Sequence, residues 1–172
     1  MFKIIVYIII FLSCSLCGYL VSLKYSLRVE RLSALTESLR ILNSEITYRR
    51  DPLPETLERI SRYKDNSSSA FFRRLTEIVR ENKTFLFMDS WKAAVDDCYQ
   101  NSPLKPCDIE IINDIGIELG KSDVEGQNNM FLRIFKRLEE CTLDAVHERN
   151  TKGKMYKTMG ITIGIAIVII LI

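Results

Sequence analysis

The residue types that could carry catalysis are few in this chain and poorly grouped. His147 is the one histidine in the sequence, and it stands among Asp144, Glu148 and Arg149. A single histidine with no serine or cysteine nucleophile beside it provides neither a Ser-His-Asp nor a Cys-His arrangement. We therefore expect His147 to be a solvated surface residue, and we predict that the protein is not an enzyme.

The cysteines give no recognisable metal or redox motif. Cys14 and Cys17 have CxxC spacing, but they lie inside an apolar segment, where neither a zinc site nor a thioredoxin-like site belongs. Cys98, Cys107 and Cys141 are scattered along the sequence, and a cytoplasmic domain would keep them reduced. The sequence thus predicts no metal site, no cofactor and no disulfide framework.

No motif for a phosphate-bearing or small-molecule substrate is present either. Gly116 and Gly120 lack the preceding strand and the lysine of a phosphate loop, so we expect them to permit close helix packing. Neighbouring carboxylates such as Asp96 and Asp97 point in different directions on a helix. The 24 basic and 22 acidic residues leave a net charge of +2, which gives no basis for nucleic-acid binding.

Two apolar segments stand at the ends of the chain. Residues 4–23 contain no charged side chain, and neither do residues 158–172. A helix of about 20 residues rises roughly 30 Å, enough to cross the hydrocarbon core of a bilayer. The second segment is shorter, but Met155 and Tyr156 can extend it. We predict transmembrane helices over 4–23, after the short amino-terminal segment 1–3, and over 158–172.

Positive charges flank both segments on the side of the middle of the chain. They are Lys24, Arg28, Arg31, Arg40, Arg149, Lys152, Lys154 and Lys157. A cleaved signal peptide is the alternative for the first segment, but its apolar run is longer than is typical, and positive charge follows it at once. The positive-inside rule then places 24–157 in the cytoplasm of a two-span membrane protein.

Gly160 and Gly164 are four residues apart within the second apolar segment. Small residues at this spacing let two membrane helices approach closely. Glycine is also common in membrane helices in general. A packing face for another helix and an incidental pair of glycines are therefore both open interpretations.

Helical periodicity dominates residues 24–157, and no run alternates in the manner of a strand. Apolar residues recur three or four positions apart in six segments, and proline, glycine or serine lies between most of them. These apolar residues lie at 29–46, 57–60, 72–79, 88–95, 109–119 and 127–145. The sequence predicts an all-α fold, with a compact six-helix bundle between the two transmembrane helices.

The heptad-like runs 29–46 and 127–145 leave a second interpretation open. The chain could be a two-span scaffold or signalling protein whose helical domain oligomerises as a coiled-coil stalk. A compact monomer of the middle domain would favour the bundle, and an elongated parallel dimer would favour the stalk.

A few residues near the ends of the predicted helices are more distinctive than a bundle requires. Glu45 and Tyr48 precede the turn at 52–54, and Asp123 follows Gly120 where the last two helices join. A capping box over 122–125 is expected to open the sixth helix. Helix caps and turn formers would explain all of these residues, whereas a surface for a partner protein is the alternative.

With these features the chain resembles the Stage III sporulation protein AB family of endospore-forming bacteria over its full length. The order of apolar end, helical domain and apolar end is one similarity. The others are an L-x-x-E-I-x-Y stretch followed by P-L-x-E, a G-x-x-L-G-x-x-D segment, and a tryptophan in the fourth helix. The matching residues are Glu45, Tyr48, Pro52, Leu53, Glu55, Trp91, Gly116, Leu119, Gly120, Asp123 and Gln127.

The resemblance implies a function that composition does not reveal. The family belongs to the mother-cell part of a secretion-like channel that spans the two membranes around the engulfed forespore. Its helical domain is similar to the cytoplasmic domains of platform proteins in type II secretion and type IV pilus systems. The implied function is a non-enzymatic platform in the mother-cell membrane, which couples a secretion-type ATPase to the other proteins of the channel complex.

Overall fold

The computed structural model describes residues 2–49, 52–63, 67–81, 86–119, 121 and 123–171, and these residues form helices joined by turns, with no strand among them. They divide into two compact units. The bundle unit is Glu30–Thr142, and the helix-pair unit comprises the described residues up to Val29 together with those from Leu143 onward. The prediction of an all-α fold with a helical bundle and two long apolar helices is confirmed.

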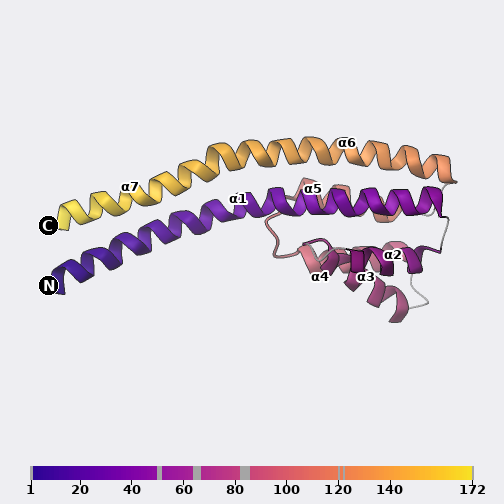
Figure 1. Cartoon of the computed structure of the whole chain (residues 1–172), viewed down its shortest axis with the longest axis horizontal. Helices are drawn as coiled ribbons and strands as arrows, with labels where there is room; N and C mark the ends of the chain where they lie inside the picture. The colour runs from indigo at the N-terminus through magenta and orange to yellow at the C-terminus, as the bar shows by residue number, and fades with distance from the viewer. Residues whose placement is uncertain are drawn as a thin grey trace. The chain divides into compact units, whose positions relative to one another are not determined.

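Six helical segments build the bundle unit. They are the second part of α1 (Phe2–Tyr48), then α2 (Leu53–Tyr63), α3 (Ser69–Glu81), α4 (Phe87–Tyr99), α5 (Pro106–Glu118) and the first part of α6 (Val124–Glu148). Successive helices from α2 to α5 pack on one another. Within this unit α1 lies between α6 on one side and α2 and α3 on the other (Figure 1).

The bundle part of α1 is the centre of the core. Leu32, Leu35, Leu39 and Leu42 recur at helical spacing and are fully buried, which is why an amphipathic helix forms here. The other large side chains that are fully buried come from the five remaining helices. They are Leu57, Phe71, Phe72, Leu75, Trp91, Ile112, Ile115 and Phe131.

Aromatic rings fill the space between α3, α4 and α5. Phe71 packs edge-on against Trp91, with ring centroids 5.1 Å apart and planes at 76°. The indole N–H of Trp91 donates to the carbonyl of Ile112 at 2.8 Å, so the one polar atom of this buried ring is satisfied. The tryptophan therefore fixes α4 against α5.

The helix-pair unit contains the first part of α1, the end of α6, the π-helical turn η1 (Arg149–Gly153) and α7 (Lys154–Leu171). The segment from Val124 to Leu171 is helical throughout, with η1 as its one described departure from α-helical geometry. The first part of α1 and α7 lie side by side, and Tyr7 near the amino end donates to the carbonyl of Leu171 at 2.8 Å (Figure 1).

The unit boundaries near residues 30 and 142 separate two groups of residues that pack mainly among themselves. The predicted domain boundaries, 24 and 157, record where charged sequence meets apolar sequence. The two kinds of boundary describe different properties, so 24–157 stays a prediction for the part of the chain outside the membrane.

Candidate functional site

Close backbone contact joins α1 to α7 in the helix pair. A Cβ atom added to Gly160 would lie 2.9 Å from the carbonyl oxygen of Cys14 and 3.0 Å from the Cα atom of Gly18. A Cβ atom on Gly18 would in turn lie 2.7 Å from the carbonyl oxygen of Tyr156. Neither contact is possible for a real side chain, so both glycines are required at this crossing. Gly164 faces the ring of Phe11 one turn further along.

The sequence analysis identified Gly160 and Gly164 and missed Gly18. A signal for Gly18 exists, because Cys14 and Gly18 are themselves small residues four positions apart in an apolar segment. The spacing alone could not reveal which face of α1 meets α7. That depends on the crossing of the two helices.

A buried charge cluster joins α1 to the end of α6. Arg28 is 3% exposed, and its Nη1 lies 3.0 Å from Asp144 Oδ2 and 3.0 Å from Glu148 Oε2. Lys152 binds the other oxygen of Glu148 at 2.5 Å. We call Arg28, Asp144, Glu148 and Lys152 the Arg28 cluster. Each buried group in the cluster has an opposite charge and a hydrogen bond, so loss of one partner would leave an uncompensated buried charge.

The π-helical turn η1 contains Lys152 of this cluster. Gly153 is buried at its end, and a Cβ atom there would lie 3.5 Å from Ser22 Oγ, an ordinary van der Waals distance. Tyr156 in the next turn stacks on Tyr25 at 6.1 Å. π-Helical turns are rare and are frequent at functional sites. His147 is exposed just before η1, as the sequence predicts.

The carboxyl end of α1 is tied to α2 by Glu45. Arg59 of α2 donates to Glu45 Oε2, and Arg49 lies 3.6 Å from the same oxygen. The carbonyl of Pro52 accepts the N–H groups of Glu55 and Thr56, so it begins α2. Leu53 is half-buried in the first turn of α2. These roles are structural.

Tyr48 differs from its neighbours because it is 83% exposed. An exposed aromatic ring at a helix end contributes nothing to the core. Aromatic side chains are enriched where proteins bind one another. Tyr48 is therefore the residue of this motif whose position fits a partner surface.

The second motif covers the connection from α5 to α6. Gly116 lies directly under the ring of Trp91, with no room for a Cβ atom, and Leu119 is buried. Gly120 and Ser122 lie outside the described residues. The side chain of Asp123 accepts the N–H of Gly126 at 2.9 Å, so Asp123 is the residue that caps α6.

The two motifs meet at one end of the bundle. Asn43 donates to Asn128 at 3.4 Å, and the guanidinium of Arg40 lies over the ring of Phe135, so the last turns of α1 run beside the first turns of α6. The end of α1 and the start of α6 lie at the same end of the bundle unit in Figure 1. Gln127 is buried there, one turn into α6.

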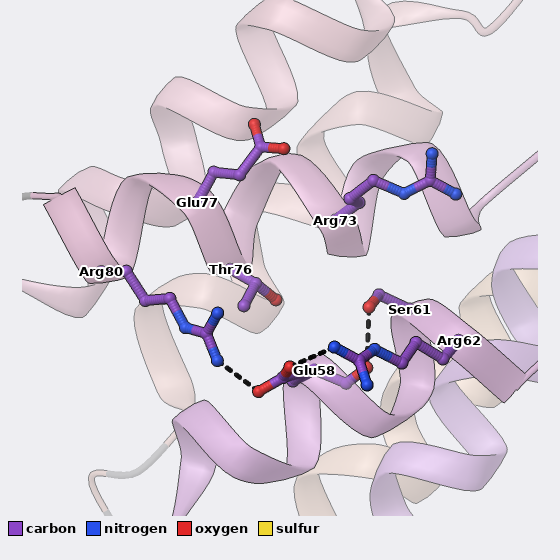
Figure 2. Close-up of a pocket in the computed structure, with 7 residues that line it drawn as sticks. All are labelled: Glu58, Ser61, Arg62, Arg73, Thr76, Glu77 and Arg80. Carbon is purple, nitrogen blue, oxygen red and sulfur yellow. Dashed lines mark hydrogen bonds and ion pairs between the residues drawn. The ribbon is translucent and has the colours of Figure 1, made fainter.

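A charged cleft of about 520 Å³ lies between α2 and α3, and the sequence analysis did not foresee it. Glu58 stands at its centre and binds Arg62 at 2.7 Å and Arg80 from the facing helix (Figure 2). Arg73 points along the other wall, and its guanidinium has no hydrogen bond or ion pair with any residue that the structure describes. The lining holds guanidinium, carboxylate and hydroxyl groups, and its guanidinium groups can bind an acidic group.

Burial changes the ionisation of two residues at the end of α4. Burial raises the pKa of the Cys98 thiol, and the charge of Asp97 raises it further. Burial also raises the pKa of the Tyr99 phenol. Both groups therefore stay neutral at physiological pH, and neither is an activated nucleophile.

Comparison with known proteins assigns the chain to a family. A family model for Stage III sporulation protein AB matches residues 3–172. Stage III sporulation protein AB of Bacillus subtilis (strain 168) is 21% identical over 171 residues, which cover 99% of both chains. A solved structure of Stage III sporulation protein AB has the same fold, with a TM-score of 0.66 and 20% identity; the match covers 73% of this chain and 98% of that one. The chain therefore belongs to the Stage III sporulation protein AB family.

Proposed function

We propose that this protein is a non-enzymatic membrane platform in the mother cell–forespore channel of endospore formation. Family membership supports a role in sporulation. The observation that carries the rest is the helix pair, in which two apolar helices are joined by the glycine contact and by the Arg28 cluster. Such a pair is suited to hold a position in a membrane and to present a helical bundle beside it.

The surface of the helix pair supports a membrane location. Both helices are long and apolar enough to cross a bilayer by length and composition. Large apolar side chains are exposed along both, which is unfavourable in water and favourable in lipid. These side chains include Ile5, Ile8, Leu12, Leu16 and Leu20 in α1, and Ile161, Ile165, Ile169 and Ile170 in α7.

In this proposal the Arg28 cluster and the basic residues around it mark the cytoplasmic end of the helix pair. The positive-inside rule then puts the bundle in the mother-cell cytoplasm. A secretion-type ATPase could reach the bundle there. Tyr48 at the end of α1 and the charged cleft between α2 and α3 are the two surfaces that a partner could use.

The chemistry of the described surface favours binding over catalysis. Among the described residues that line the charged cleft there is no histidine, cysteine or lysine, and Glu58 is bound by two arginines. Because Arg62 and Arg80 each donate to one of its two oxygens, this carboxylate is poorly placed to accept a proton from a substrate. The arrangement supports a platform and not an enzyme.

The burial of residues in the bundle fits the stalk interpretation less well than the platform interpretation. In a stalk, the apolar residues of 29–46 would pack against a second copy of the chain. Leu32, Leu35, Leu39 and Leu42 are instead buried against helices of the same chain. No apolar seam is left on this part of α1 for a partner helix.

Topology is the experiment that tests the location. Protease is added to intact protoplasts that express the chain with an epitope tag in the bundle. Protection of the tag supports a cytoplasmic bundle that an ATPase can contact. Digestion from outside would overturn the proposal, because a bundle between the two membranes could not contact a cytoplasmic motor.

Coupling is tested with flexible inserts in a sporulating host. We expect a glycine-serine insert after Lys24, or one before Lys157, to lower the yield of heat-resistant spores, because movement of the bundle would no longer reach the apolar helices. An insert of the same composition in the 64–66 connection between α2 and α3 is the matched control. Full sporulation with both helix inserts would contradict the coupling function.

A further inference from the structure

We propose that Cys107, Asp108 and Cys141 form a binding site for a thiophilic divalent cation of the Zn²⁺ type. One ligand atom from each residue lies within 4.8 Å of the other two. The residues come from two helices, α5 and α6, and the two cysteines are far apart in the sequence. These cysteines are scattered along the sequence, and the tertiary structure brings two of them together.

Ion pairs between α5 and α6 fix the backbone around this site. Arg137 binds Asp114 at 2.5 Å, and Arg133 binds Glu118 at 2.7 Å. These two contacts set the register of one helix on the other. Both contacts join the same two helices that carry the thiols of Cys107 and Cys141.

Asp108 supplies an oriented carboxylate. Its side chain is fully buried, and Oδ2 accepts the N–H of Lys105 at 2.9 Å, which closes the first turn of α5. Oδ1 faces the sulfur of Cys107 at 3.8 Å. One oxygen thus holds the carboxylate in place and the other lies against the Cys107 thiol.

The donor set and its spacing select the kind of ion. Zinc binds thiolate sulfur at about 2.3 Å and carboxylate oxygen at about 2.0–2.2 Å, which puts tetrahedral ligand atoms roughly 3.5–3.8 Å apart. The three groups need to close by about 1 Å to reach that geometry. Two sulfur ligands favour Zn²⁺ or Cd²⁺ over Mg²⁺ and Ca²⁺. Cys107 is exposed, so water can be the fourth ligand.

Binding would change both the charge and the stability of the bundle. Each thiol must lose its proton to become a ligand, so up to two protons are released to solvent for each Zn²⁺ bound. The ion would then join the start of α5 to α6. An ion held by both helices binds the folded state more tightly than the unfolded chain, so it stabilises the bundle by an amount that increases with the logarithm of its affinity.

The experiment uses the full chain in detergent, reduced with a phosphine. Cys14, Cys17 and Cys98 are first changed to serine, so that Cys107 and Cys141 are the remaining thiols. ZnCl₂ is titrated against a chromophoric chelator, and CdCl₂ is added separately to follow the sulfur-to-cadmium charge-transfer absorption. We expect one ion per chain, with the absorption of two thiolate ligands.

Two further substitutions in that background assign the ligands. Loss of an outer-shell partner already weakens metal binding by about 10–100-fold, so Cys107→Ser and Cys141→Ser should each weaken it by at least about tenfold. Asp108→Asn can still accept the N–H of Lys105, and it should weaken Zn²⁺ binding while keeping the cadmium–sulfur absorption. Circular dichroism and thermal unfolding without metal verify that each variant is folded.

Two results would overturn the proposal. One is a background variant that binds neither Zn²⁺ nor Cd²⁺ at micromolar concentrations. The other is binding that persists with equal affinity in the Cys107→Ser/Cys141→Ser double variant. Neither result bears on membrane topology or on the spore yield with flexible inserts, so the metal site and the platform function are tested independently.

Discussion

At the scale of single residues, the positions that the family patterns identify divide into structural ones and exposed ones. Gly116 is structural because Trp91 covers it, and Asp123 is structural because it caps α6. Glu45 is bound to Arg59 between two helices. Tyr48 is an exposed aromatic residue among these positions, and its ring is available for a partner.

Gly116→Ala should destabilise the bundle. The added methyl group meets the Trp91 ring, and displacement of that ring also strains its hydrogen bond to Ile112. Overpacking of this kind costs about 1–3 kcal/mol of unfolding free energy. Urea unfolding followed by Trp91 fluorescence measures the loss. Gly153→Ala, whose methyl group makes ordinary contacts, is the matched control; equal stability of the two variants would contradict the prediction.

Cys98 should react slowly with iodoacetamide near neutral pH. Its raised pKa keeps the thiol protonated, and the thiolate is the reactive form. The rate should therefore be low at neutral pH and increase as the pH rises through the elevated pKa. A variant with Cys98 as the single cysteine, followed by mass spectrometry, measures this rate. The same variant in denaturant gives the reference, and equal rates in both states would be inconsistent with a raised pKa.

At the scale of helices, two different kinds of contact hold α1 within the helix-pair unit. Glycine permits backbone contact between α1 and α7, and the Arg28 cluster joins α1 to α6 by charge. The first contact suits a lipid environment, where close backbone packing replaces the hydrophobic effect. The second suits the edge of the membrane, where charge can be both buried and neutralised.

Gly160→Ala should weaken the helix pair. The new methyl group would overlap the backbone of α1, so the two helices must separate. We expect a lower thermal stability of the full chain in detergent and a lower spore yield. Gly153→Ala on the same helical segment has room for its methyl group and should change neither. A Gly160→Ala chain that matches the Gly153→Ala chain in both measurements would contradict close packing at Gly160.

Arg28→Met should lower the stability of the protein by more than the loss of one surface charge would. It leaves Glu148, 10% exposed, without its arginine, and breaking a buried ion pair costs about 3–5 kcal/mol. Lys152 reduces this cost because it still binds Glu148. The thermal stability of the full chain in detergent measures the loss. The double variant Arg28→Met/Glu148→Gln should recover part of it, and a double variant no better than Arg28→Met would show that the ion pair is not the cause.

At the scale of the whole molecule, a single chain forms two units with different surfaces, and the bundle unit lies in sequence between the two segments of the helix-pair unit. The bundle unit buries its leucines and aromatic rings, whereas the helix pair exposes its apolar residues. A core of that kind needs no second copy. A surface of the second kind needs lipid or protein around it.

The isolated segment 30–142 should be a folded monomer. Its core is closed by helices of the same chain, so the segment should scatter as a compact domain with a radius of gyration of about 13 Å. Small-angle scattering with light-scattering mass determination tests this expectation. An elongated dimer would revive the stalk interpretation.

The sequence by itself determined the features that depend on local order along the chain. Apolar ends, helical periodicity and the turn before α2 are encoded within a few residues of each other, because helix formation and membrane preference are local properties. The exposure of His147 followed in the same way from its polar neighbours. The family patterns are also features that the sequence encodes locally, because each is a short run of residues.

The tertiary structure alone decided which distant residues meet. The contact of Gly18 with Gly160, the pairing of Arg28 with Glu148, and the approach of Cys107 to Cys141 all join segments far apart in the sequence. So does the charged cleft, whose walls come from two helices. Periodicity gives the buried face of each helix and not its partner, because the crossing and register of two helices depend on the packing of all their side chains together.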